Sequence, residues 1–333
     1  MYKVKVENLK QLDIALSSKN VSEIILARDS FSENSLQKLV DKIKNKSKLA
    51  FILMERISRY EESMKSTATV SGDMKREKQN DDLRLSTDKI YEIKNLDGVI
   101  IQNLDSFAYM LRKINKSGNE KLKVELNYTM NCYNTETKKL YKTLYNDKRQ
   151  NADEVPLTFT APVELNIYEL SAVRYDTIIL YSFIDTMVTA NCLRKTTYEM
   201  DKNVGKSKNI CEHRFDFDNV KEFSSYIIDR KGKKLHYKTY CKYCYNKIYN
   251  TEPLYLLDKI DEIESIYYKG IDIRNSKDVG YKTKANDICK ENILNELKYR
   301  IDFSFENEEE VKNILNGDAP ASFTRGHIKN TIK

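Results

Sequence analysis

Short apolar runs alternate with helix-like patterns along the first half of the chain, and this alternation constrains the fold more than any other sequence feature. Extended patterns cover residues 2–6, 21–27 and 49–54, and amphipathic helical patterns cover residues 9–17 and 32–46, the latter with Ser32 as N-cap. The run at 49–54 is apolar throughout, as expected for a strand that is covered on both faces. Strands that alternate with helices favour a parallel sheet.

The same rhythm continues as far as residue 183. Further strands are predicted at 97–102, 121–129, 157–160 and 177–183. Further helices are predicted at 104–114, 135–145 and 167–173. Strand–helix units in this number, without a GxGxxG motif, favour a closed barrel over a Rossmann sheet. The predicted fold class is therefore α/β, with a (β/α) TIM-barrel-like core.

The second half of the chain breaks this rhythm, and the sequence predicts three segments. Residues 1–183 hold the barrel repeats, 184–253 form a cysteine-bearing metal segment with a hairpin, and 254–333 hold the closing elements and the tail. The hairpin is predicted at 227–237, where Gly232 can adopt the positive φ of a tight turn.

The closing elements are a helix at 254–266, a late strand at 299–305 that completes the barrel, and a helix at 307–315. The polar stretches at 58–92 and 267–290 are predicted to be insertions.

Charge says little about partners. The net charge of +7 comes from 57 basic and 50 acidic residues, so a nucleic-acid partner is one interpretation. DNA is not expected as a partner. The abundance of Lys, Asn, Ile and Tyr also fits a codon bias toward A and T, which would raise the charge without selection for phosphate binding.

No targeting or membrane-spanning segment is expected. The first ten residues, MYKVKVENLK, lack the apolar core of a signal peptide. The longest apolar stretch, at 177–183, is far shorter than the roughly 20 residues that a membrane span needs. A cytoplasmic location is therefore predicted.

Four of the six cysteines are candidate metal ligands. Cys241 and Cys244 form a CxxC pair, which can direct two sulfurs to one ion, and Cys192 and Cys211 precede it beside polar or turn-forming sequence. A reducing compartment makes disulfides unexpected. A single CxxC is an incomplete zinc signature, so spacing alone leaves zinc and an iron–sulfur cluster open.

The other interpretations of the cysteines are weaker. A redox CxxC should open a helix after a strand, which residues 240–250 do not clearly do. Cys132 and Cys289 are expected to have no chemical role.

Three further residues are candidates for a site. Glu164 follows a predicted strand, where a barrel places its chemistry, or it caps the next helix. Arg325 and His327 could bind an anionic substrate, or they make an ordinary contact of the tail. His213 and His236 are expected at the surface. Protease chemistry has little support, because HExxH and GxSxG motifs are absent from the sequence.

The chain resembles the peptidase U32 (collagenase-like) family over residues 160–327, about half its length. The resemblance rests on TAPVELN at 160–166, MVTANCLRKTT at 187–197, DRKG at 229–232, YCKYCYNKIYN at 240–250, YRIDF at 299–303 and TRGH at 324–327. The first half resembles the start of the second barrel-like region in long members of that family.

This resemblance implies a 4Fe–4S cluster on Cys192, Cys211, Cys241 and Cys244, with zinc as the alternative. It implies oxygen-independent hydroxylation of tRNA or rRNA bases or of a small aromatic compound such as a ubiquinone precursor, possibly with a U32-type partner protein. Proteolysis, which gives the family its name, is the alternative, as is a non-catalytic, metal-stabilised binding role.

The chain also departs from the family in three places. A longer loop separates Cys192 from Cys211, a basic-glycine turn does not directly follow His327, and the resemblance leads us to expect no counterpart of the first barrel region of long members.

Overall fold

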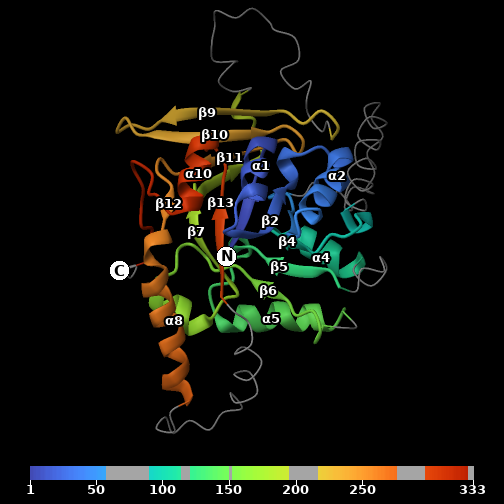
Figure 1. Cartoon of the computed structure of the whole chain (residues 1–333), viewed down its shortest axis with the longest axis vertical. Helices are drawn as coiled ribbons and strands as arrows, with labels where there is room; N and C mark the ends of the chain where they lie inside the picture. Colours follow the sequence, from blue (N-terminus) through green and yellow to red (C-terminus); the bar gives the residue numbers. More distant parts are fainter. Residues whose placement is uncertain (58–89, 114–120, 150–151, 195–216, 276–296, 329–333) are drawn as a thin grey trace, which may run out of the picture.

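The computed structural model describes residues 1–57, 90–113, 121–149, 152–194, 217–275 and 297–328 of the 333-residue chain (Figure 1). Two β-sheets and a set of helices make up this part of the molecule. None of the described helices is long and apolar enough to cross a membrane.

A mostly parallel sheet of nine strands forms the centre of the described structure, and we call it the barrel-like sheet. Its order is β12-β7-β13-β1-β2-β3-β4-β5-β6, and every neighbouring pair is parallel except β12 and β7. Its strands are β1 (Tyr2–Val6), β2 (Val21–Ala27), β3 (Leu49–Leu53), β4 (Gly98–Ile101), β5 (Lys123–Leu126), β6 (Thr158–Phe159), β7 (Thr177–Ser182), β12 (Leu254–Tyr255) and β13 (Lys298–Asp302).

This sheet curls until β6 meets β7. Thr160, just after β6, forms a parallel bridge with Thr177. The amide of Ala161 donates to the carbonyl of Thr177 at 2.8 Å, and the amide of Asp176 donates to the carbonyl of Phe159 at 3.0 Å. The late strand β13 lies between β1 and β7, as the sequence predicts. The fold is thus mixed α/β and compatible with a TIM-barrel-like fold.

Most strands of the sheet are followed by a helix, as the sequence pattern predicts. The helices are α1 (Leu9–Ser17), α2 (Glu33–Lys44), α4 (Leu104–Lys113), α5 (Thr135–Asn146), α6 (Ile167–Val173), α8 (Ile260–Asn275) and α10 (Glu308–Asn316). Short 3₁₀ turns lie at Arg28–Ser30, Tyr128–Met130 and Leu257–Lys259. The main apolar core joins these helices to the outward-facing side chains of the strands, such as Val4, Ile24 and Ile52.

Helix starts follow from short polar side chains. Asn8 caps α1, and α6 and α10 both begin with a capping box. Ser32 is the N-cap of α2 as predicted, but its side chain makes no capping hydrogen bond. Instead, the amide of Glu33 donates to the carbonyl of Phe217 at 3.1 Å, which connects the start of α2 to the segment that precedes residue 222.

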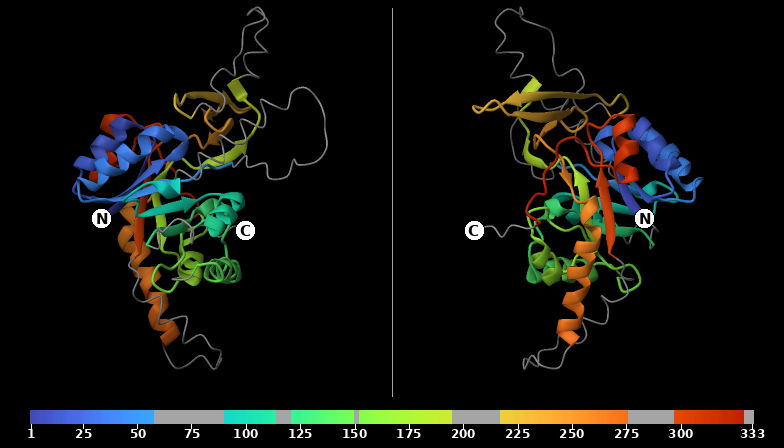
Figure 2. Two further views of the ribbon diagram at one scale, coloured as in Figure 1. Left: turned by 90° about the vertical axis from the view of Figure 1, so that its right-hand side faces the viewer. Right: turned by 60° about the vertical axis from the view of Figure 1, so that its left-hand side comes forward.

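The second sheet, which we call the lid sheet, is antiparallel with the order β8-β11-β10-β9. Its strands are β8 (Asp185–Thr189), β9 (Glu222–Ile228), β10 (Lys234–Tyr240) and β11 (Tyr245–Tyr249). It lies across the end of the molecule toward which β7 and β13 point (Figures 1 and 2).

The predicted hairpin is confirmed as β9 and β10. Asp229 accepts hydrogen bonds from the amides of Lys231 and Lys233, both at 2.8 Å, and Gly232 has a φ of 78°.

One helix prediction is wrong. The expected helix at 254–266 begins instead with the strand β12, which pairs with β7, and the helix α8 starts only at Ile260. The apolar run after Pro253 is long enough for a strand, and the acidic residues Asp261 and Glu262 mark the first helical turn. Residues 267–275 continue α8 rather than starting an insertion, whereas 58–89 and 276–296 lie outside the described residues.

Candidate functional site

Polar side chains gather where the parallel strands end. Such ends carry the catalytic groups of barrel enzymes. The buried residues at these positions are Glu7 after β1, Arg28 and Asp29 after β2, Glu55 after β3, Gln102 after β4, Asn127 after β5, and Asp302 at the end of β13. We call this set the barrel-end residues.

Ion pairs fill the interior of the barrel-like sheet. Arg300 binds Asp302 through two hydrogen bonds of 2.6 and 2.8 Å and donates to the Asn127 side chain at 2.9 Å. Lys3 lies 2.6 Å from Glu125 and 3.7 Å above the centre of the Phe51 ring.

Apolar side chains complete this interior. Ile25, Phe51, Leu53 and Ile100 form a small separate cluster. At Gly98, a Cβ atom would lie 2.5 Å from the Phe51 ring and 2.8 Å from the carbonyl of Lys123, so only glycine fits. The interior is therefore packed and is not a channel.

Three lysines of the lid sheet neutralise acids at this end of the barrel. Lys238 lies 2.5 Å from Glu7 and 3.0 Å from Glu222. Lys242 lies 2.8 Å from Glu33, and Lys247 lies 3.5 Å from Asp29. All three lysines are buried, so their charges are compensated by these carboxylate partners rather than by solvent.

Tyrosines of the lid sheet add hydrogen bonds to the same acids. The hydroxyl of Tyr245 donates to Asp29 Oδ2 at 2.5 Å, and that of Tyr240 donates to Glu7 Oε2 at 3.2 Å. The hydroxyls of Tyr240 and Tyr249 are 2.8 Å apart. A short chain of hydroxyl groups thus leads from Glu7 into the lid sheet.

Neighbouring carboxyls here have pKa values shifted in opposite directions. Burial opposes the ionisation of Glu7, but Lys238, Lys5 and Lys247 together hold its pKa well below the usual range. Burial raises the pKa of Asp29 and of Glu222 despite the nearby lysines. Asp29 Oδ1 also accepts no hydrogen bond from the described residues. Carboxyls with separated pKa values are suited to acid and base roles.

The four residues of the CxxC motif, 241–244, form the turn between β10 and β11. The amide of Cys244 donates to the carbonyl of Cys241 at 3.2 Å, and Cys244 has a φ of 54°. Lys242, inside the turn, donates to the carbonyls of Arg28 and Phe31, both at 2.7 Å. Since Arg28 directly follows β2, the CxxC turn is fixed against the barrel end.

Cys192 lies at the same end of the lid sheet. Thr189 at the end of β8 is paired with Asn246 in β11, and the Asn246 side chain donates to the carbonyl of Asn191 at 2.5 Å. Cys192, Cys241 and Cys244 are each partly buried.

The predicted metal centre is only partly described. Cys211 lies outside the described residues, as do Cys289 and His213. Among the residues that the structure describes, no three His, Cys, Asp or Glu side chains gather closely enough to hold a metal ion. Cys132 is buried in the main core, whereas the tyrosines around the CxxC turn form a separate cluster, and burial raises the pKa of the Cys132 thiol to about 11.

Glu164 lies in the loop between β6 and α6, beside Tyr133, whose pKa is raised by burial and then by this carboxyl. The helix that follows is capped by Asn166 and Glu169, not by Glu164.

The two tail candidates lie near the loop that carries Glu164, because Val163 and Leu165 line the same small cavity as Arg325 and His327. The guanidinium of Arg325 donates hydrogen bonds to the carboxylate of Asp258 and to the carbonyl of Tyr255. His327 is exposed, and with Arg325 it lines a cavity of about 20 Å³, which has room for about one water molecule. His236 is half-buried against Phe183 and Phe305 rather than at the open surface.

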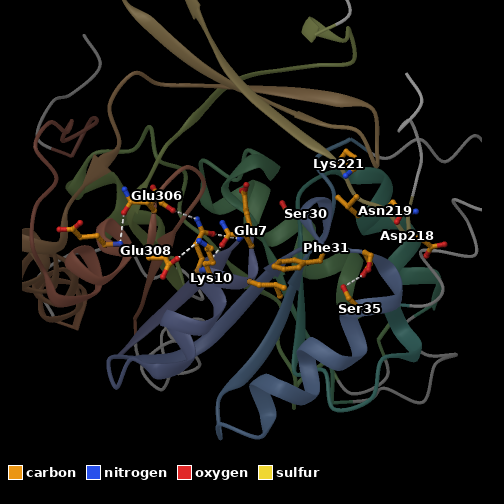
Figure 3. A pocket seen from close by; sticks show the side chains of 17 residues that line it. Glu7, Lys10, Ser30, Phe31, Ser35, Asp218, Asn219, Lys221, Glu306 and Glu308 are labelled. Atoms are coloured by element: carbon orange, nitrogen blue, oxygen red, sulfur yellow. Dashed lines mark hydrogen bonds and ion pairs between the residues drawn. The ribbon is translucent and has the colours of Figure 1, made fainter. Parts of the chain in front are cut away.

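An open groove of about 1070 Å³ leads to the barrel end beside Glu7 (Figure 3). The starts of α1, α2 and α10 and the segment before β9 line it. Lys10 and Glu308 form an exposed ion pair of 2.8 Å across its rim. Glu7 lines the inner end of the groove but is itself only 4% exposed.

Sequence reasoning did not single out Glu7, Asp29, Glu33 or their lysine partners. One signal was present: Lys3, Lys5 and Glu7 alternate with valines in β1, which indicates a strand with a polar inner face. A carboxylate directly after such a strand is a candidate barrel-end residue.

The described residues thus define a mixed α/β protein with a curled, mostly parallel sheet whose carboxyl end is covered by a second sheet. No protein-family model and no curated protein matches the chain. The solved structure of the U32 peptidase Mk0906 is similar over 56% of this chain and 72% of that chain, with 14% identity and a TM-score of 0.33. This degree of similarity does not assign the chain to a family.

Proposed function

We propose that this chain is a cysteine-ligated metal protein, with an iron–sulfur cluster held by Cys192, Cys211, Cys241 and Cys244 beside the barrel end. Its role would be the oxygen-independent hydroxylation of an RNA base or a small aromatic compound. The hydroxylation and the cluster type come from the sequence resemblance alone. The observation that supports a metal site is the CxxC turn, fixed by Lys242 against the residues that follow β2.

The backbone of this turn favours a role for Cys244. A φ of 54° is one that Gly or Asn adopts easily, whereas other residues carry a cost of roughly 1–2 kcal/mol. Cysteine at this position is explained if its sulfur is needed. Strained positions cluster at functional sites.

The chain's own residues could move protons next to such a site. Asp29, whose pKa is raised by burial, could hold and release a proton, whereas Glu7, whose pKa is lowered by Lys238 and Lys5, would stay ionised and balance the buried lysines. A bound iron–sulfur cluster would supply electron transfer or substrate activation.

Metal analysis of pure protein is the direct test of the site. Anaerobically purified wild type should contain iron and sulfide, with a visible absorption band that the variants Cys192→Ser, Cys241→Ser and Cys244→Gly lose. Cys132→Ser is the matched control, because Cys132 is buried in the main core and is not part of the CxxC turn. Stoichiometric zinc without iron would change the cofactor, and a wild type without either metal would refute the site.

A second experiment addresses the reaction. Deleting the gene should remove an oxygen from a nucleoside in total RNA or from a quinone, as seen by mass spectrometry. Wild type should restore it and Cys241→Ser should not. Rescue by Cys241→Ser would separate the function from the metal, and an unchanged spectrum in the deletion would leave a binding role as the better account.

A further inference from the structure

The turn between β9 and β10 carries exposed positive charge. Arg230, Lys231, Lys233 and Lys234 are all exposed, and none of them forms an ion pair with the described residues. The acid beside them, Asp229, uses its carboxylate to bind two backbone amides of the turn. We call these four basic residues the hairpin tip. It projects beyond the barrel-like sheet (Figure 1).

Exposed apolar side chains lie next to the hairpin tip. Tyr226 is 49% exposed and Ile228 is 57% exposed, and both are on the face of β9 that also carries Glu222. Lys234 Nζ lies 4.7 Å from the centre of the Tyr226 ring. An aromatic ring beside exposed cations is a combination that suits nucleic-acid bases and phosphates.

A pocket of about 530 Å³ lies beneath this hairpin. Phe183, His236 and Phe305 form an aromatic wall, with ring centres 5.3 to 6.0 Å apart. The polar lining includes Glu306, Glu310, Asn313 and Asp318, but neither Lys nor Arg. The pocket is therefore suited to a flat ring that carries hydrogen-bond donors, and unsuited to a phosphate.

The hairpin tip and the pocket are continuous. His236, which lines the pocket, is directly opposite Tyr226 across the hairpin. Lys234 precedes His236 by two residues on the same face of β10, which separates them by about 7 Å. One extended ligand can thus reach both.

We propose that the hairpin tip and this pocket form a binding site for single-stranded nucleic acid, with phosphates on the tip and one base in the pocket. The amino and imino groups of the base would donate to the carboxylates, and its ring would stack on the aromatic wall. A duplex is a poor fit, because its bases are already stacked and paired. An anionic membrane is also disfavoured, since the carboxylates of the pocket would face its negative surface. The site does not depend on the metal proposed above.

Fluorescence anisotropy with fluorescein-labelled 12-nucleotide RNA, DNA and duplex RNA tests the site. Wild type should bind the single strands more tightly than the duplex, and binding should weaken steeply with salt. The variant Lys231→Ala/Lys233→Ala should lower the slope of log K against log salt by about 1.4, or about 0.7 per lost phosphate contact. The control Lys46→Ala/Lys139→Ala removes the same charge elsewhere and should leave the slope unchanged.

The pocket is tested by Phe305→Leu, which keeps an apolar side chain but removes the ring. It should weaken binding at least about fivefold with the salt slope unchanged, because one stacking contact is lost. Tighter binding of RNA than of DNA would identify the sugar that is recognised.

Four outcomes would overturn the proposal. They are no binding at low salt, equal loss in the control variant, preference for the duplex, and binding of phosphatidylglycerol vesicles in place of the oligonucleotides. Because Cys241→Ser should bind the oligonucleotides normally, failure of this site and failure of the metal site are distinguishable.

Discussion

The lid sheet has a tight turn at each end of β10, and the two turns meet the same backbone requirement with different residues. The β9–β10 turn places Gly232 at a φ of 78°, and the β10–β11 turn places Cys244 at a φ of 54°. Glycine is the relaxed choice for this conformation. The first turn therefore has a relaxed backbone, whereas the second places a cysteine in a conformation that carries some cost in stability.

The lysines of the two turns differ in burial and in ion pairing. Lys242 in the β10–β11 turn is 0% exposed and contacts two carbonyls and Glu33. Lys231 and Lys233 in the β9–β10 turn are exposed and form no ion pair with the described residues. One end of the lid sheet is thus anchored to the barrel end, and the other is available to a partner.

A matched pair of substitutions tests this difference most directly. Lys242→Ala should lower the free energy of unfolding by roughly 3–5 kcal/mol, because it leaves Glu33 and two carbonyls short of a buried partner. Lys231→Ala should change it by no more than about 0.5 kcal/mol. Urea unfolding followed by circular dichroism measures both.

Equal effects of the two substitutions would mean that the β10–β11 turn is not anchored as described. Lys242→Met then separates charge from packing. It keeps the length of the side chain, so a smaller loss than in Lys242→Ala would show that part of the effect comes from apolar packing.

The anchoring of this end could not be predicted from the sequence, although most of the barrel could. The strands β1 and β2 and the helices α1 and α6 were predicted with their observed bounds, because local apolar periodicity is enough to define them. The strands β8 and β11 were missed. Lys247 in β11 is buried beside Asp29 of the barrel end, and Asn246 is buried between Thr239 and the carbonyl of Asn191, so both depend on contacts that the local sequence does not show.

The candidate site also has one part that the sequence predicts and one part that it does not. The CxxC pair is visible in the sequence because its spacing is local. The contacts of Glu7 with Lys238 and of Glu33 with Lys242 join residues more than two hundred positions apart. Neither partner has a local signature, so only the tertiary fold reveals them.

Acid pH sharpens the comparison further, because the anchored end depends on ionised carboxylates. Burial opposes ionisation of Glu33, but Arg28 and Lys242 lower its pKa below the ordinary 4.5. A carboxyl whose folded-state pKa is lowered stabilises the protein above its unfolded-state pKa, and this contribution is lost as the pH falls.

The stability difference between wild type and Glu33→Gln should therefore be largest near pH 7. It should shrink below about pH 4.5 by at most about 1.4 kcal/mol per pH unit. Urea unfolding at pH 7, 5, 4 and 3 measures this difference. A difference that stays constant down to pH 3 would show that the ionised form of Glu33 does not stabilise the anchored end.

The smallest expected effects come from substituting the two positive-φ residues, Gly232 and Cys244. These substitutions test whether the two turns differ in backbone strain. Gly232→Ala should destabilise the protein by about 1 kcal/mol through backbone strain alone, since a Cβ atom there meets no atom of the described residues within 4 Å. Cys244→Gly should instead leave the metal-free protein as stable as wild type, or up to about 1 kcal/mol more stable, because relief of strain outweighs the added freedom of the unfolded chain. Both variants can be measured by urea unfolding in the presence of a chelator. If Cys244→Gly destabilised the metal-free protein as much as Gly232→Ala does, the thiol would be contributing to packing, and its unusual backbone conformation would no longer favour a metal ligand at this position.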